Sequence, residues 1–430
     1  MDAILQYGMG KEMHELVTNL YPICRSITGN GLRDTLRRIQ TYIPLTIHEV
    51  PTGTQVFDWT IPKEWNVREA YIKTAAGQTV VDFRQSNLHV LNYSAPVRAR
   101  LSLEELKAHL YSLPAYPDWV PYKTSYYKTA WGFCVTHRTL EALPPGQYDV
   151  LIDSSLEDGS LSYGEYYLEG STRDEVLISS HCCHPSLCND NLSGIAVATF
   201  LAIWLQEVPR RYSYRFIFAP GTIGSIAWLA KNESLVPRIK HGLVVSCVGD
   251  GGPFTYKKSR QGNAEIDHVV EHVFRHAGKP YQIRDFSPYG YDERQYCSPG
   301  FNLAVGALSR TPHGEFPEYH TSADDLRLVR PEHMAESLGQ IRAICAVLEN
   351  NHSYQNQNPK CEPQLGKRGL YRQMGGNTAQ PPNESAMLWV LNLSDGHRSL
   401  LDIAERSGLN FLLVADAAQA LETAGLLKRE

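Results

Sequence analysis

The sequence has no strong excess of charge of either sign and no long uninterrupted apolar run. Its 41 lysines and arginines stand against 46 aspartates and glutamates, so the formal net charge is −5. The chain therefore lacks the overall basic character with which nucleic-acid-binding proteins neutralise phosphates. A membrane-spanning helix needs about 20 consecutive apolar residues, and no run of letters approaches that length. We expect neither a nucleic-acid partner nor a membrane-embedded protein.

The cysteines form no regular framework. They number nine, an odd count, and two of them, Cys182 and Cys183, are adjacent. Small disulfide-stapled domains usually carry even numbers at regular spacings, so we expect free thiols in a reducing compartment, the cytoplasm. The first residues show no basic segment followed by an apolar core, which predicts no signal peptide. Zinc ligation by Cys183 and nucleophilic attack by Cys188 are both less favoured than burial as small apolar side chains.

The 430 residues are enough for two or three domains, and 43% of them are hydrophobic, which is ordinary for a globular protein. From about residue 148 to 350, apolar strands alternate with amphipathic helices. EVLISS (175–180) reads as a strand, and NLSGIAVATFLAIWLQE (191–207) reads as the helix that follows it. This alternation predicts an α/β fold with a mostly parallel or mixed sheet and helices on both faces.

The rest of the chain has a different character. Residues 46–134 contain short β-branched and aromatic runs separated by prolines, which predicts a β-rich domain inserted between residues 1–45 and 135–350 of the α/β domain. Within it, the aromatic string TSYYKTAWGF is expected to be a core strand, with a substrate wall as the alternative. Residues 351–384 are polar and contain glycine and proline, which predicts a linker. Residues 385–430 show three short helical segments and a glycine turn, which predicts a winged-helix-like domain.

The charge of residues 385–430 bears on what this last domain does. It carries six acidic residues and four basic ones, which suits a DNA backbone poorly. We therefore interpret it as a packing or dimerisation unit, and the sequence leaves room for a homo-oligomer. A transcription regulator that uses this tail is the alternative.

The most informative segment is ISSHCCHPSLCNDNLSG, residues 178–194. It places His181 and His184 beyond the end of a predicted strand and Asp190 just before a predicted helix. Open α/β sheets bind ligands at the carboxyl ends of their strands, and imidazole together with carboxylate is a good ligand set for zinc. The asparagines on either side of Asp190 are expected to anchor the loop. The alternative is that Asp190 only caps the helix and the histidines are ordinary loop residues.

A second segment is expected to complete the site. RTPHGEFPEYHTSADDL, residues 310–326, follows another predicted strand, so it lies at the same edge of the sheet. It supplies His320 as the third ligand. The same loop contains His313, Glu315 and Glu318. Each of these could equally be a solvated surface residue with no part in the site.

These strings resemble the co-catalytic zinc aminopeptidases. That family has a His, a bridging Asp in an Asp-Asn-x-Ser-Gly string, and a final His in a Tyr-His-Thr string; here HPSLCNDNLSG precedes YHTSADDL. Over nearly all of its length the chain also resembles an uncharacterised bacterial aminopeptidase-like family with an RSITGxG segment, a β-rich insertion, a DERQ string and a C-terminal winged helix. The resemblance implies a zinc exopeptidase-like fold. It matches Asp190 to the bridging Asp, His320 to the final His and His184 to the first His, with His181 as the alternative.

The sequence departs from the aminopeptidase pattern in two places. The family has a Glu-Glu pair, one general base and one metal ligand, where this chain has Gly221 and Thr222, and a later metal Asp where this chain has Ser246. Too few carboxylates remain for two ions, so we expect one Zn²⁺ with three ligands and an open fourth position. Glycine cannot take a proton, and general-base catalysis is typically worth about 10²–10⁴-fold. Another group must replace the base, or hydrolysis is lost.

The string YGYDERQYCSPG, residues 289–300, offers candidates for that group, because the resemblance places it at the rim of the site. Glu293 is the expected catalytic base, or else a contact for a substrate amine. Asp292 and Arg294 are expected to bind substrate, Arg294 through its planar fork to a carboxylate, together with Tyr319 beside His320. The alternative is a solvated loop with an internal ion pair.

The sequence therefore predicts a zinc-dependent, aminopeptidase-like hydrolase that cleaves an amide or peptide bond in a small peptide or aminoacyl conjugate. Gly221 motivates a different hypothesis, a catalytically weakened relative that keeps the fold and the metal and serves as a binding or scaffold protein. The resemblance alone implies a role in glycan or natural-product biosynthesis.

Overall fold

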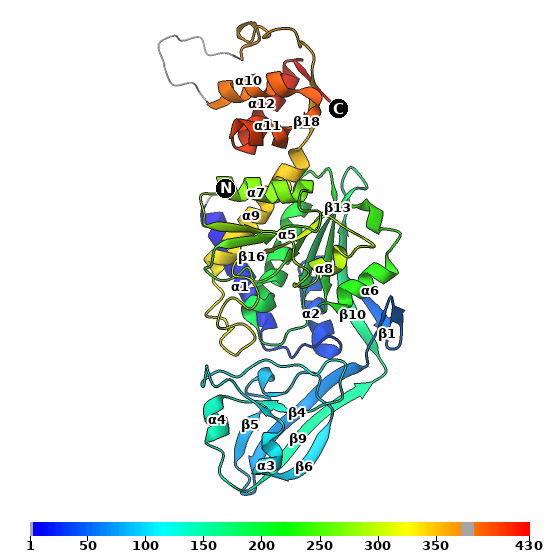
Figure 1. The fold of residues 1–430 in the computed structure, drawn as a ribbon, viewed down its shortest axis with the longest axis vertical. Helices are drawn as coiled ribbons and strands as arrows, with labels where there is room; N and C mark the ends of the chain where they lie inside the picture. The colour runs from blue at the N-terminus through cyan, green and yellow to red at the C-terminus, as the bar shows by residue number, and fades with distance from the viewer. Residues whose placement is uncertain (1–2, 371–381) are drawn as a thin grey trace. The chain divides into compact units, whose positions relative to one another are not determined.

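The computed structural model of the protein describes residues 3–370 and 382–430. The chain divides into two compact units (Figure 1). The first comprises Met1–Ala264 and Pro280–Gly339, and the second comprises Glu265–Lys279 and Gln340–Glu430. Each unit has helices and a β-sheet of its own.

An eight-stranded mixed sheet forms the centre of the first unit (Figure 1). The four strands β12, β11, β13 and β16 run parallel, while β10 and β14 pair antiparallel at their two sides. In order across the sheet, the strands are β1 (Thr46–Pro51), β10 (Ser160–Leu168), β12 (Ser213–Ala219), β11 (Glu175–His181), β13 (Ile239–Val245), β16 (Val305–Ser309), β14 (Phe254–Lys257) and β15 (Tyr281–Arg284). The predicted α/β fold with a mixed sheet is confirmed.

The apolar pattern of the central strands explains their position. Every residue of β11 and of β12 is buried, as expected for strands covered by helices on both faces. The helices that begin in this unit are α1 (Ala3–Leu20), α2 (Asn30–Gln40), α3 (Leu103–Lys107), α4 (His137–Glu141), α5 (Gly194–Gln206), α6 (Ile223–Lys231), α8 (Glu293–Tyr296) and α9 (Pro331–Asn350). Pro331 occupies the first turn of α9, where proline is well tolerated.

One helical stretch of the described chain, Cys188–Gln206, is long and apolar enough to cross a membrane by length and composition, and 89% of its apolar window is buried inside the protein. It comprises a π-helical turn, η2 (Cys188–Ser193), and α5. The sequence shows no uninterrupted apolar run of this length, because Asp190 and its flanking asparagines lie within it. In the structure α5 packs against β11 and β13, so the stretch serves as a core helix.

The β-rich part of the first unit forms a separate four-stranded sheet (Figure 1). Its order is β5 (Thr79–Asp82), β4 (Glu64–Thr74), β9 (Gln147–Glu157) and β6 (Val97–Ser102). The strand pairing differs from the predicted range 46–134 at both ends, since β1 joins the eight-stranded sheet and β9 joins the insertion. The two-residue strands β2 (Gln55–Val56), β3 (Trp59–Thr60), β7 (Leu110–Tyr111) and β8 (Phe133–Cys134) complete this region.

The aromatic string predicted as a core strand folds differently. Of residues 124–133, only Phe133 lies in a named strand, and the others form turns and irregular structure. Tyr122, just before the string, is buried, and its hydroxyl lies 3.0 Å from that of Tyr126. Aromatic residues are common in strands, where they pack well. Most residues of this string instead lie in turns and irregular structure. An alternating sequence pattern cannot distinguish these two arrangements.

The second unit contains α7 (Glu265–His276) and the C-terminal domain. That domain has three helices and a small antiparallel sheet in the order β18 (Asp395–Ser399), β17 (Ser353–Asn356) and β19 (Leu427–Arg429). The helices are α10 (Pro382–Leu393), α11 (Leu400–Ser407) and α12 (Phe411–Thr423). Strand β17 falls in the range predicted as a linker, 351–384, while residues 371–381 of that range lie outside the described chain.

Candidate metal centre

The sheet brings the two predicted segments to one edge. His181 is the last residue of β11, His184 follows in the loop, and Asp190 lies in η2. His320 lies in the loop after β16. Because β11 and β16 both run parallel to β13, their carboxyl ends lie at the same edge of the sheet. This is where an open α/β sheet binds its ligands.

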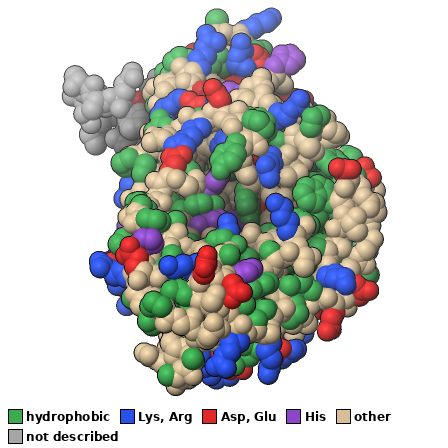
Figure 2. Space-filling view, turned by 60° about the horizontal axis from the view of Figure 1, so that its bottom comes forward, with side chains coloured by type: hydrophobic (Ala, Val, Ile, Leu, Met, Phe, Trp, Pro, Cys, Tyr) green, Lys and Arg blue, Asp and Glu red, His purple; other side chains and the backbone are tan. Residues whose placement is uncertain are grey.

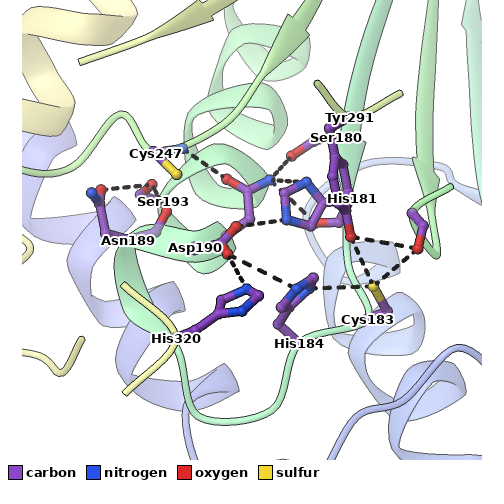
Figure 3. Close-up of polar contacts among 12 residues, drawn as sticks. Ser180, His181, Cys183, His184, Asn189, Asp190, Ser193, Cys247, Tyr291 and His320 are labelled. Carbon is purple, nitrogen blue, oxygen red and sulfur yellow. Dashed lines mark hydrogen bonds and ion pairs between the residues drawn. The ribbon is translucent and has the colours of Figure 1, made fainter. Parts of the chain in front are cut away.

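Three imidazoles converge on the carboxylate of Asp190 (Figure 3). The Nε2 atom of His181 lies 2.8 Å from Oδ1, whereas the Nε2 atoms of His320 and His184 lie 3.0 and 3.9 Å from Oδ2. One ligand atom from each of His181, His184 and Asp190 lies within 4.8 Å of the others. Asp190 thus presents one oxygen to His181 and the other to the pair of His184 and His320.

Burial and charge set the protonation of this cluster. Burial by itself would raise the pKa of the Asp190 carboxyl, but the neighbouring His184, His181 and His320 hold it well below its usual range. Burial lowers the pKa of His184 well below that of a free histidine. Asp190 is therefore a carboxylate and His184 a neutral imidazole, the forms that bind a metal ion.

The asparagines beside Asp190 anchor the loop as expected. Asn191 donates from Nδ2 to Ser180 Oγ at 2.9 Å and accepts on Oδ1 from the backbone N–H of Cys247. Asn189 donates from Nδ2 to Asp250 Oδ2 at 2.7 Å, and Asp250 also accepts from the backbone of its own turn. These bonds tie the loop to the segment that follows β13 and thereby fix the carboxylate of Asp190.

Asp324 supports the same loop from the His320 side. Its two carboxyl oxygens accept the backbone N–H groups of Asn189 and Asp190 at 2.6 and 2.9 Å. Burial raises the pKa of Asp324 to about 8. The sequence contained this residue in the ADDL string, but nothing local distinguished it from a solvated surface acid.

Two segments distant in sequence hold the ligand loops. Arg25, fully buried in the RSITG string, donates from Nε to the backbone oxygen of His184 at 2.8 Å. The backbone N–H of Tyr122, from the β-rich insertion, donates to the backbone oxygen of His320 at 2.7 Å. The Tyr122 ring lies edge-on to the His320 ring, and the Tyr319 ring stacks on the His320 ring at a centroid distance of 3.9 Å.

Tyr291 fills the space beside Gly221. A Cβ atom added at Gly221 would overlap the Tyr291 ring, whose hydroxyl would be 2.6 Å away. The Tyr291 hydroxyl donates to the backbone oxygen of Gly221 at 3.4 Å, and its ring lies 4.2 Å from that of His181. Burial raises the pKa of Tyr291 well above its usual range, so the hydroxyl keeps its proton. Sequence reasoning missed this residue, because one tyrosine in a loop carries no signal.

Cys183 contacts both His184 and Tyr291 (Figure 3). Its Sγ atom is 3.3 Å from His184 Nδ1 and 3.7 Å from the Tyr291 hydroxyl. Burial raises the pKa of Cys183 to about 12, so it is a neutral thiol. All nine cysteines are free.

The residues of the DERQ string lie in different surroundings. Asp292 is buried, and its Oδ1 accepts from Ser225 at 2.9 Å, while its Oδ2 has no hydrogen-bond partner in the described chain. Burial raises the pKa of Asp292 to about 6. Glu293 is also buried and pairs with Lys257 at 2.5 Å. Arg294 is exposed on α8.

A cavity of about 210 Å³ adjoins the histidine cluster. Tyr291, Glu293, His313 and Ser246 are among its lining residues, whereas Asp292, Arg294 and Tyr319 are not. Figure 2 shows that one face of the molecule is hollowed and that histidine side chains are visible in the hollow. The cavity contacts the metal centre through Tyr291, whose ring lies against that of His181.

The fold and this site together define an aminopeptidase-like protein. A zinc aminopeptidase from Bacillus subtilis superposes with a TM-score of 0.56 over 79% of this chain and 94% of that one, at 14% identity, which shows the shared fold. The chain belongs to the family described as a domain of unknown function (DUF4910), which it matches over residues 14–351. Residues 352–429 match a winged helix-turn-helix domain. The predicted aminopeptidase-like fold and C-terminal winged helix are confirmed.

Relatives from Clostridium acetobutylicum are much more similar. One, named for polysaccharide biosynthesis and an aminopeptidase-like domain, is 53% identical over 419 residues, which cover 97% of this chain and 96% of that protein. A crystal structure described as that of a peptidase from the same organism superposes with a TM-score of 0.95 at 51% identity, covering 99% of this chain and 97% of that one. The fold and these names support a peptidase-like function.

Proposed function

We propose that the protein is a zinc-dependent amide hydrolase that uses one zinc ion, held by His184, Asp190 and His320. The observation that carries the proposal is the convergence of buried imidazoles on the single carboxylate of Asp190. Two neutral imidazoles and one carboxylate match the ligands that zinc takes in catalytic sites. Such a site leaves a fourth position open for water or substrate.

The two oxygens of Asp190 support this choice of ligands. His184 and His320 both face Oδ2, so an ion beside that oxygen would meet all three groups. His181 faces Oδ1, and its Nδ1 lies 3.4 Å from the side-chain nitrogen of Asn191. This contact favours a ring that accepts from Asn191 and donates from Nε2 to Asp190. We assign His181 the role of orienting the carboxylate.

The residues at positions 221 and 246 favour one ion over two. Position 221 has no side chain and is covered by Tyr291, and position 246 is a serine. Neither supplies a carboxylate ligand for a second zinc. Zinc, when bound, supplies Lewis-acid chemistry, because it polarises a carbonyl and lowers the pKa of water.

Residues of this chain would position the substrate and move its proton. Tyr291 keeps its proton, and a substrate carbonyl oxygen would have to replace the backbone oxygen of Gly221 as the acceptor of its hydrogen bond. Glu293 lines the cavity and is held next to Lys257, so we propose it as the proton carrier in place of the missing base. Asp292, Arg294 and Tyr319 remain proposed substrate contacts, although none of them lines the cavity.

The proposed substrate is a small peptide or aminoacyl conjugate. The name of the Clostridium acetobutylicum relative supports polysaccharide biosynthesis as its setting. The proposal places the protein in the cytoplasm without a nucleic-acid or membrane partner. It treats the winged-helix domain as a packing or dimerisation unit, consistent with its excess of acidic residues.

Metal content and chelator-sensitive turnover test this function. Elemental analysis of purified protein should find one zinc per chain, and aminoacyl anilides should be hydrolysed until a chelator is added. His320→Ala should lose the zinc, while His137→Ala on α4, whose ring pairs only with Glu141 and Ser112 in the described chain, should keep it. Two zinc ions per chain, or a zinc-loaded protein that cleaves no amide, would contradict the proposal.

A further inference from the structure

Most of the residues that line the cavity beside the metal centre carry polar atoms, which stand among the apolar surfaces of rings and side-chain stems. Of its fourteen lining residues, all except Ala307 and Pro312 carry a polar or charged side-chain atom. Pockets for small ligands are usually lined mainly by apolar and aromatic groups. A pocket for an aliphatic amino-acid side chain is expected to be especially apolar, because the burial of apolar surface drives its binding. This cavity therefore suits a ligand that combines several polar groups with apolar surface.

The floor of the cavity follows from strand register. In the antiparallel pair of β14 and β16, Thr255 lies opposite Ser309, and Lys257 lies opposite Ala307. Residues two apart on a strand share a face, and so do residues directly opposite each other. All four side chains therefore belong to one face of the sheet, and all four line the cavity.

The hydroxyl of Thr255 is the group that points to a ligand. Thr255 is only 3% exposed, and its Oγ1 has no hydrogen-bond partner among the residues that the structure describes. Buried hydroxyl groups are nearly always hydrogen-bonded, because an unmade bond is costly. A hydroxyl group on a ligand in this cavity would satisfy Thr255, with Ser309 and Ser246 close by in the same lining.

Charge excludes an anionic ligand. Five lining side chains carry full charges, two positive and three negative, which sum to −1: Lys257, Arg284, Asp285, Glu293 and Glu315. Lys257 pairs with Glu293, and Arg284 pairs with Glu315. Burial lowers the pKa of His313, which keeps that ring neutral. Both cations are already paired, so the cavity favours a neutral or cationic ligand over a carboxylate or phosphate.

Two tyrosines give the cavity flat apolar surfaces beside its polar groups. Tyr291 is half-buried, with its ring against that of His181 in the metal centre, and Tyr289 is 79% exposed. A tyrosine ring combines an apolar face with a polar tip. Such a face packs against the C–H groups of a sugar ring, while the serine, threonine and charged groups bond its hydroxyls.

We propose that this cavity binds the hydroxyl-rich ring of an N-acyl amino sugar, whose amide is then presented to the metal centre. Ser246 and Tyr291 are among the residues that line the cavity, and the Tyr291 ring lies against that of His181 in the metal centre. In hydrolysis, the oxygen of one water bonds to the carbonyl carbon and the carbon–nitrogen bond breaks. Both protons of the water end on the nitrogen, which leaves a carboxylate and an ammonium sugar. The inference rests on the proposed amide hydrolysis, but it names an acylated amino sugar as the substrate in place of a small peptide or aminoacyl conjugate.

Binding of the free amine tests the cavity independently of turnover. By calorimetry on the full-length zinc-loaded protein, glucosamine should bind at least tenfold more tightly than cyclohexylamine, the same ring size without hydroxyls. Thr255→Val removes the hydroxyl and should weaken glucosamine binding by about three- to tenfold, as expected for one hydrogen bond. Thr199→Val, which removes a buried hydroxyl in α5 that donates to Ile195, should leave it unchanged. Equal binding of both amines, or no effect of Thr255→Val, would overturn the inference.

Turnover separates this inference from the function on which it rests. N-acetylglucosamine should be deacylated in a chelator-sensitive way, and faster than leucine anilide. Chelator-sensitive cleavage of leucine anilide without glucosamine binding would overturn the sugar cavity and leave the hydrolase standing. Glucosamine binding that depends on Thr255, with no cleavage of any amide, would instead refute the hydrolase.

Discussion

The two halves of the sheet edge around Asp190 have different chemistry. On the Oδ2 side, His184 and His320 face the carboxylate, and the loops that carry them are held by Arg25 and Tyr122. On the Oδ1 side, only His181 faces Asp190, and Tyr291 occupies the space beyond Gly221. We call this second half the repacked half, because the Tyr291 ring fills the space that a side chain at position 221 would need. We expect that a carboxylate placed at position 221 alone would not fit there.

The largest effect is expected from the residue that both halves share. Asp190→Asn keeps the shape of the side chain but removes its charge, so zinc content should fall from one per chain to near zero and amide hydrolysis should stop. Elemental analysis of the purified variant measures this. Asp325→Asn, which alters an acid that pairs with Arg327 beyond the His320 loop, is the matched control and should retain zinc. Full zinc in Asp190→Asn would place the metal elsewhere.

The buried carboxyl group of Asp292 should make the free energy of unfolding depend on pH. Its pKa is raised to about 6 when folded, above the value of about 3.9 in an unfolded chain, so the folded state binds more protons between these values. The free energy of unfolding should therefore fall by about 2–3 kcal/mol as pH rises from about 4 to 6, and this term should not change further above that range.

Denaturant unfolding across pH 4–7 measures the contribution of Asp292. Asp292→Asn is uncharged throughout and should make the fall in that window smaller, although the raised pKa of Asp324 leaves part of the slope. Asp58→Asn at an exposed position should leave the profile unchanged. An identical slope for Asp292→Asn and the parent protein would contradict the assignment.

Restoring a glutamate at position 221 should fail on its own. Gly221→Glu drives its side chain into the Tyr291 ring, so it should destabilise the protein by about 1–3 kcal/mol, as overpacking does, without raising activity. The double variant Gly221→Glu with Tyr291→Gly should recover part of that loss, since the two changes share one space. Thermal unfolding and zinc stoichiometry measure both variants. A stable Gly221→Glu protein with raised activity would show that the half-site is not repacked.

The smallest effect is expected where the halves meet. Cys183 contacts His184 on one side and Tyr291 on the other. Cys183→Ala should weaken zinc binding by about tenfold, at the low end for a group that contacts a metal ligand. Cys183→Ser keeps a polar partner for His184 and should lose less. A competition titration with a zinc indicator measures the difference, and equal affinity of all three proteins would limit Cys183 to packing.

The sequence predicted the parts of the molecule that short-range patterns encode. Alternating apolar runs gave β11 and α5, and the strings around Asp190 and His320 brought two distant segments to one edge. The partners of β1 and β9 were not predictable, because pairing between strands depends on contacts far apart in the chain. The same limit applies to Tyr291 over Gly221, and to Glu293, whose partner Lys257 lies 36 residues earlier.

The bond between the backbone of Tyr122 and that of His320, with the bridge from Pro121 to Thr321, has a consequence for any attempt to shorten the protein. Through these two contacts, the inserted β-rich region holds the loop that carries His320 in place. Cutting it away to leave a minimal α/β domain would release that loop. The smallest version of this protein that keeps its metal centre therefore contains the insertion.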